Sequence, residues 1–186
     1  MSYSAVKKYF IFLSGLLILL SSAGCREKTD LSKSGENIVC YAAAYNSGIY
    51  KSDNGGISWY PLLEDQEDIY FYSKKLFESP YSKRLYVTTT GAGLFSIDME
   101  KGALNRVGDF KDENVSSVVF KEASNRQPAE LEIYLGIKEK GVFKSLFGTD
   151  NWEPANDGLT YRDVNVIFRN SGALLAGTIN GIFRLD

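Results

Sequence analysis

The stretch Gly141-Val142-Phe143-Lys144-Ser145 decides the fold, because the chain contains related copies of it. The others are Gly48-Ile49-Tyr50-Lys51-Ser52, Gly93-Leu94-Phe95-Ser96 and Gly181-Ile182-Phe183-Arg184. The copies begin at residues 48, 93, 141 and 181, which are intervals of 45, 48 and 40 residues. Self-similarity with a period of about 40–50 residues is typical of propellers and solenoid arrays.

The residues around each copy read as β-strands. A short apolar, β-branched or aromatic run precedes every copy, and Gly lies where a tight turn enters the next strand. Counting these runs gives about fourteen strands, with no opening strand in the first unit and no outer strand in the last. We therefore predict an all-β fold: a partial or small β-propeller of about 3.5–4 four-stranded antiparallel blades. Three arrangements stay open, namely a closed four-bladed ring, a ring completed by two copies, and a partial arc related to a longer protein.

A turn motif follows the first copy. The segment Ser52-Asp53-Asn54-Gly55-Gly56-Ile57-Ser58-Trp59 resembles the Asp-box, or BNR repeat, in which Ser, Asp, Gly, Thr and Trp recur at fixed spacing. Ser52, Gly56 and Trp59 match that pattern, whereas Asn54 replaces Asp and Ser58 replaces Thr. A short Asx side chain can hydrogen-bond to the backbone of its own turn. We therefore interpret these five residues as structural.

Two later units keep partial copies of the same motif. Ser145 and Trp152 remain in the third unit, and Ser96 and Asp98 in the second. The resemblance covers roughly residues 38–186 and implies relatives among sialidases, xyloglucanases and photosystem II assembly factors, all of which are β-propellers. In these families the Asp-box is a structural turn, so the resemblance assigns no catalytic residue here.

The N-terminal region is predicted to direct export and to attach the protein to a membrane. Residues 1–24 have two lysines, a short apolar run and small residues, which is typical of a secretory signal peptide. Ser22-Ala23-Gly24-Cys25 resembles a bacterial lipobox, which implies a lipid on Cys25. Residues 25–37 are polar and predict a flexible tether before the domain at 38–186. Because Arg26 and not Asp follows Cys25, we expect an exported protein on the outer membrane or cell surface.

Composition excludes several classes of function. The chain contains no histidine, so no Ser-His, Cys-His or His-metal scheme is available to it. The formal net charge is −2 without a basic block, which argues against nucleic-acid binding. Nothing in the sequence suggests a metal or other cofactor. Cys40 lies in a strand-like run, where we expect a buried, unreactive thiol.

Two classes of function remain. We expect a non-catalytic binding or assembly module, with a protein or glycan held by exposed aromatic side chains. The candidates for this aromatic surface are Tyr70, Tyr72, Tyr81 and Tyr86. The alternative is a truncated relative of a sialidase- or xyloglucanase-like glycoside hydrolase, although no arginine lies in a sialidase-like sequence context. We further expect that two copies could complete a propeller as a homodimer.

Overall fold

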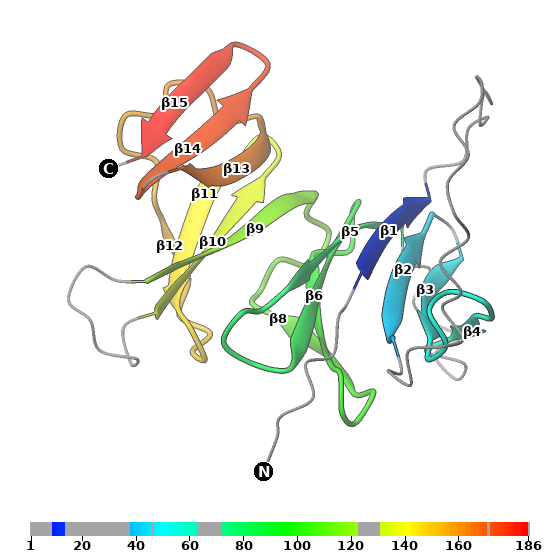
Figure 1. Cartoon of the computed structure of the whole chain (residues 1–186). Helices are drawn as coiled ribbons and strands as arrows, with labels where there is room; N and C mark the ends of the chain where they lie inside the picture. The colour runs from blue at the N-terminus through cyan, green and yellow to red at the C-terminus, as the bar shows by residue number, and fades with distance from the viewer. Residues whose placement is uncertain are drawn as a thin grey trace.

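A computed structural model describes residues 9–13, 38–45, 47–62, 72–122, 131–170 and 172–185. In these ranges all the regular secondary structure is β-strand, and no helix there is long or apolar enough to cross a membrane. Four sheets follow one another along an arc, from the first sheet to the C-terminal sheet (Figure 1). Each sheet is one of the repeated units, so the prediction of an all-β fold with propeller-type blades is confirmed.

The strands fall into four blades in chain order. In each blade neighbouring strands in the sequence are also neighbours in the sheet, and from β2 onward every pairing is antiparallel. Blade 1 contains β1 (Tyr9–Leu13), β2 (Cys40–Ala44), β3 (Gly48–Ser52) and β4 (Tyr60–Pro61); blade 2 contains β5 (Ser73–Glu78), β6 (Arg84–Thr89), β7 (Leu94–Asp98) and β8 (Leu104–Val107); blade 3 contains β9 (Val115–Glu122), β10 (Leu131–Ile137), β11 (Gly141–Leu146) and β12 (Glu153–Pro154); blade 4 contains β13 (Val164–Asn170), β14 (Ala173–Thr178) and β15 (Gly181–Leu185).

The strand count agrees with the sequence, with one difference at the start. Fourteen strands, β2 to β15, lie in the described residues from 38 onward, and blade 4 has three strands there, as predicted. The first unit was expected to lack an opening strand, but β1 pairs with β2 (Figure 1). This pairing is parallel, whereas the opening strands of the other blades are antiparallel to their neighbours. β1 falls within the segment for which the sequence predicts a signal peptide, and that signal peptide stays a prediction. Cys25, the tether at 25–37 and Tyr70 lie outside the described residues.

Burial explains why the strands are apolar on both sides. We call the face of a blade that is turned toward the following blade its forward face, and the opposite one its backward face. Three apolar clusters fill the contacts between blades 1 and 2, 2 and 3, and 3 and 4. Strand β6 belongs to blade 2, which packs on blade 1 with one face and on blade 3 with the other, so five of its six residues are buried. Strand β13, which no described blade follows, is buried only at Val164 and Ile167.

Candidate functional site

The Asp-box turn of blade 1 closes by hydrogen bonds among its own residues. The buried Ser52 hydroxyl accepts from the Gly56 amide at 2.8 Å and donates to Asn54 Oδ1 at 2.9 Å. Asn54 Oδ1 also accepts from the Ser58 amide at 3.0 Å, and Asn54 Nδ2 donates to Ser58 Oγ at 2.8 Å. Trp59 Nε1 donates to the Gly56 carbonyl at 3.0 Å. Asn54 thus bonds the turn backbone from the position where the Asp-box usually has Asp, and all five motif residues are occupied in holding the turn.

Replacing Ser52 by alanine is expected to reduce the free energy of unfolding by about 1–3 kcal/mol. The change leaves the Gly56 amide without its acceptor beside a fully buried side chain. Urea denaturation would measure the loss. Ser47→Ala is the matched control, because Ser47 is exposed in the turn after β2. Equal stability of the two variants would show that the hydroxyl of Ser52 does not hold the turn.

The partial Asp-box of blade 3 closes by hydrogen bonds of other residues and by packing of its tryptophan. Ser145 Oγ lies 3.0 Å from Thr149 Oγ1, and Thr149 Oγ1 donates to the Leu146 carbonyl at 2.9 Å. Trp152 Nε1 donates to Asp150 Oδ1, and its ring lies edge-on to Phe110 at 5.2 Å between centroids. Asp150 Oδ1 accepts from the Gly108 amide as well, which ties the turn to the chain that leaves blade 2. The turn is therefore also a scaffold element.

The two ends of the blades differ in what they carry. Strands β3 and β11 each run from a glycine turn to an Asp-box turn, so these turns lie at opposite ends of the blades. We call the end with the Asp-box turns the Asp-box end. The other end, which we call the connection end, carries the turns before Gly48, Gly93, Gly141 and Gly181 and the segments that enter β5, β9 and β13.

The structure divides the predicted aromatic surface between these ends. Tyr72 immediately precedes β5 and lies at the connection end, whereas Tyr81 follows β5 and lies at the Asp-box end. Tyr86 is buried on β6, because its side chain points into the contact with blade 3. The three described candidates therefore do not form one exposed surface.

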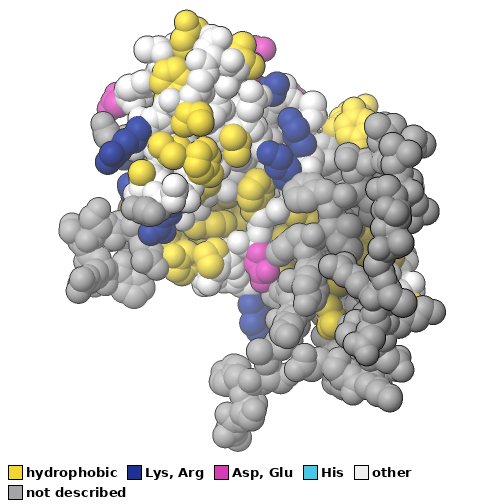
Figure 2. All heavy atoms as spheres, turned by 45° about the horizontal axis from the view of Figure 1, so that its top comes forward, with side chains coloured by type: hydrophobic (Ala, Val, Ile, Leu, Met, Phe, Trp, Pro, Cys, Tyr) yellow, Lys and Arg dark blue, Asp and Glu magenta, His cyan; other side chains and the backbone are white. Residues whose placement is uncertain are grey.

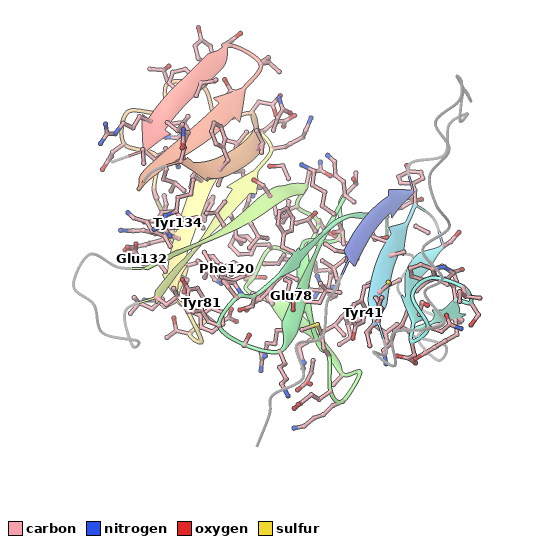
Figure 3. All side chains as sticks on the ribbon, viewed as in Figure 1. Tyr41, Glu78, Tyr81, Phe120, Glu132 and Tyr134 are labelled. Carbon is pink, nitrogen blue, oxygen red and sulfur yellow. The ribbon has the colours of Figure 1, made fainter. Side chains whose placement is uncertain are left out.

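Tyr81 and Tyr86 belong to an aromatic cluster at the contact between blades 2 and 3. Tyr86 lies edge-on to Phe120 at 5.4 Å, Phe120 to Phe147 at 5.9 Å, and Phe147 to Tyr81 at 6.5 Å. Figure 3 shows Tyr81 and Phe120 near each other between the two sheets. Edge-to-face aromatic pairs stabilise packing beyond the area that they bury. Phe147 occupies the position where an intact Asp-box has Asp, and there it packs against Phe120 and Tyr81.

The connection end carries an exposed aromatic pair that the sequence did not reveal. The rings of Tyr45 and Tyr72 lie 5.6 Å apart between centroids at an interplanar angle of 48°. Tyr45 is 63% exposed and Tyr72 42% exposed. Ser73 fixes the spacing of the two blades beside them, because its hydroxyl donates to the Ala44 carbonyl at 3.0 Å. Tyr45 was not predicted from the sequence. It lies in a turn 27 residues before Tyr72, and nothing in the sequence indicates that the two residues are in contact.

Charged side chains at the same end are engaged with one another. Lys140 forms an ion pair with Glu113, and Lys138 Nζ lies 4.0 Å from Asp163 Oδ1. Both pairs link a turn of blade 3 to a segment that enters a neighbouring strand. Partly exposed ion pairs contribute little stability, so their main effect here is on the charge pattern of the surface.

The structure places several candidate catalytic side chains of the described residues apart or in the core. Tyr41, Tyr86 and Tyr134 occupy the same place in three blades, and burial raises the pKa of each phenol. Such hydroxyls stay protonated and make poor nucleophiles. Asp98 ends β7 at the Asp-box end, whereas Asp163 precedes β13 at the connection end, so they cannot act as a carboxylate pair. No group of three or more acidic or cysteine side chains among these residues is placed to hold a metal ion.

Comparison with known proteins identifies the fold. No protein-family model matches the chain, and no curated protein matches it. The extracellular domain of a hybrid two-component system from B. thetaiotaomicron matches with a TM-score of 0.56 and 14% identity, over 75% of this chain and 20% of that one. The GH74 xyloglucanase from Xanthomonas campestris matches with a TM-score of 0.55 and 13% identity, over 76% and 24%. A GH74 enzyme from Niastella koreensis matches with a TM-score of 0.53 and 15% identity, over 79% and 24%.

These likenesses, together with the repeated blades, define an all-β protein of the propeller type. The chain spans between 20% and 24% of the length of the three structures. At 13–15% identity the agreement concerns the arrangement of strands and not the chemistry of any site.

Proposed function

We propose that the protein is an exported, lipid-anchored cell-envelope lipoprotein whose propeller-like domain is a non-catalytic binding or assembly module. Its ligand is an exposed protein segment or a glycan, and it binds at the connection end. The proposal includes removal of residues 1–24, a lipid on Cys25 and a tether at 25–37 that holds the domain away from the bacterial outer membrane or cell surface. It also includes a two-copy assembly that completes a ring of blades.

The exposed pair of Tyr45 and Tyr72 is the observation that carries the binding proposal. Exposed aromatic rings are the usual platforms for sugar rings and for apolar peptide side chains. The two rings come from different blades and contact each other beside the hydrogen bond from Ser73 to the Ala44 carbonyl. Rings that already lie together in the free protein lose less conformational entropy when a ligand binds.

Replacing Tyr45 or Tyr72 by alanine is expected to weaken binding about tenfold or more, because each change removes one ring of the platform. The ligand would first be found with a glycan array and by affinity capture from cell-envelope extract, and its affinity measured by calorimetry. Tyr81→Ala is the matched control, since Tyr81 is also exposed but lies at the Asp-box end. Weaker binding in Tyr81→Ala alone would place the binding site at the Asp-box end and contradict the proposal.

The alternative function is that of a truncated glycoside hydrolase of the sialidase or xyloglucanase type. Two of the structures with this fold are GH74 enzymes, but the fold alone does not transfer their activity. Release of sugar from xyloglucan or from a fluorogenic sialoside by the purified chain would support the hydrolase. We expect no release of sugar. Tyr41, Tyr86 and Tyr134 are buried, and Asp98 and Asp163 lie at opposite ends of the blades.

The anchor has a test of its own. Cells that express the full chain should incorporate labelled fatty acid into it and retain it in the membrane fraction. The Cys25→Ser variant should lose the label. Labelling that survives this substitution would contradict the assignment of Cys25.

A further inference from the structure

One position of the repeat is buried in three blades and exposed in the fourth. Ile49, Leu94 and Val142 each follow the repeated glycine and are 2%, 0% and 0% exposed. They lie on forward faces, in the three apolar clusters that join successive blades. Ile182 follows the glycine of blade 4 and is 70% exposed. The forward face of blade 4 therefore presents to solvent the residue that the other blades bury.

The neighbours of Ile182 make most of this face apolar, and Arg184, opposite Leu175 in the strand register, borders the apolar side chains. Gly177 lies between Val166 and Ile182 in the strand register, and Leu175 lies next to Phe168. Val166 is 37% exposed and Phe168 36% exposed. Figure 2 shows hydrophobic side chains, with Lys and Arg side chains around them, on the surface that comes forward with the C-terminal sheet. In the other blades the equivalent surface packs on the next sheet.

The backward faces share a complementary feature. On each of them a small or aliphatic residue of the second strand lies opposite an aromatic residue of the third. In blades 2, 3 and 4 this pair belongs to the cluster that contacts the preceding blade, or packs against it. Blade 1 has the same kind of pair, although no blade precedes it among the described residues. The pairs are Ala42 and Tyr50, Val87 and Phe95, Leu135 and Phe143, and Ala176 and Phe183.

Part of the backward face of blade 1 is accessible. Tyr50 is partly exposed and Pro61, which lies opposite it on β4, is exposed, whereas Ala42 is buried. Tyr50 and Pro61 are therefore the side chains that an incoming forward face would meet first.

We propose that two copies of this chain assemble head to tail, with the forward face of blade 4 of one copy packed on the backward face of blade 1 of the other. This specifies the contact for the two-copy assembly proposed above and rests on that part of the proposal only. A two-fold axis repeats the contact and closes a ring of eight blades, within the usual range of about four to eight. The two faces that no described blade covers then pack in the way that already joins blades 1 to 4.

The same observations argue against packing of blade 4 on blade 4. Besides its apolar side chains, the forward face of blade 4 carries Arg184, which lies opposite Leu175 in the strand register. Two forward faces packed on each other would therefore bring like charges together.

The first test is the mass of the assembly. The purified full chain, kept in mild detergent, should have twice the mass of one chain in native mass spectrometry. Ile182→Arg should return it to one chain. Ile57→Arg, at another highly exposed isoleucine in the Asp-box turn of blade 1, should leave the assembly intact. A single-chain mass for the unchanged protein at micromolar concentration would overturn the proposal.

The second test separates the two ways of pairing. In a Cys40→Ser background, copies with Ile182→Cys and copies with Tyr50→Cys are co-expressed, and mild oxidation should link one to the other. Pro61→Cys replaces Tyr50→Cys if the latter does not fold. A disulfide between two Ile182→Cys copies, or no link between the two kinds of copy, would overturn the head-to-tail contact. Either failure would leave the ligand test intact, because Tyr45 and Tyr72 lie between blades 1 and 2.

Discussion

Replacing Gly93 by alanine is expected to reduce the free energy of unfolding by about 3 kcal/mol. Gly93 has a φ of +85°, which costs a residue with a side chain about 1–2 kcal/mol. A Cβ at this position would also lie 2.4 Å from the carbonyl oxygen of Phe110. Because that atom belongs to the backbone, the segment that enters blade 3 must shift to make room. Denaturant unfolding measures the loss.

Gly48→Ala is the matched control for this prediction. Gly48 occupies the equivalent position of blade 1 and has the same φ of +85°, but an added Cβ there meets no atom within 4 Å. We expect it to cost only about 1 kcal/mol, from the backbone conformation alone. Similar losses at Gly93 and Gly48 would mean that the contact with Phe110 contributes nothing.

Replacing Leu94 by alanine is the second change with a large expected effect, a loss of about 3 kcal/mol. Leu94 is fully buried and packs with Val118 and Leu135 in the cluster between blades 2 and 3. Removing its side chain leaves a cavity at the contact of two sheets, which can close only in part. The loss would be measured by urea denaturation with circular dichroism.

Ile182→Ala is the control at the equivalent position of blade 4. Since Ile182 is largely exposed in the single chain, we expect a loss below about 0.5 kcal/mol in protein diluted to separate chains. At higher concentration the same variant should assemble less readily than the unchanged protein. A loss for Ile182→Ala as large as that for Leu94→Ala in dilute protein would mean that the single chain already covers this face.

The turn from Ser52 to Trp59 shows why the sequence was informative about local structure. The hydrogen bonds among its motif residues join positions no more than four apart, so the spacing of Ser, Asn, Gly and Trp predicts the turn. The Gly55 amide adds one longer-range bond, to the Ile38 carbonyl at 2.9 Å. The strands were predictable for a related reason: they are short runs of β-forming residues, and the third strand of each blade begins at or directly after a glycine that takes positive φ, such as Gly93 or Gly141. β1 is the exception, because its partner strand lies far along the chain.

The candidate site was less predictable because its contacts are not local. Tyr72, Tyr81 and Tyr86 lie within 15 residues of one another, yet they point to one end, to the other end and into the core. Which of them is exposed depends on whether another blade covers that side of the strand. The same holds for Tyr45 and Tyr72, whose contact exists only because two blades lie side by side.

The sequence by itself determined the repeat, the strand order and the Asp-box turn, because neighbouring residues in the chain form the hydrogen bonds and turn conformations that these require. Only the tertiary structure decided that Tyr45 and Tyr72 share one surface, that Tyr86 belongs to the core and that Ile182 is left uncovered. The reason is that burial of an apolar side chain depends on the sheet packed against it. An isoleucine after the repeated glycine is a core residue in blade 1 and a surface residue in blade 4.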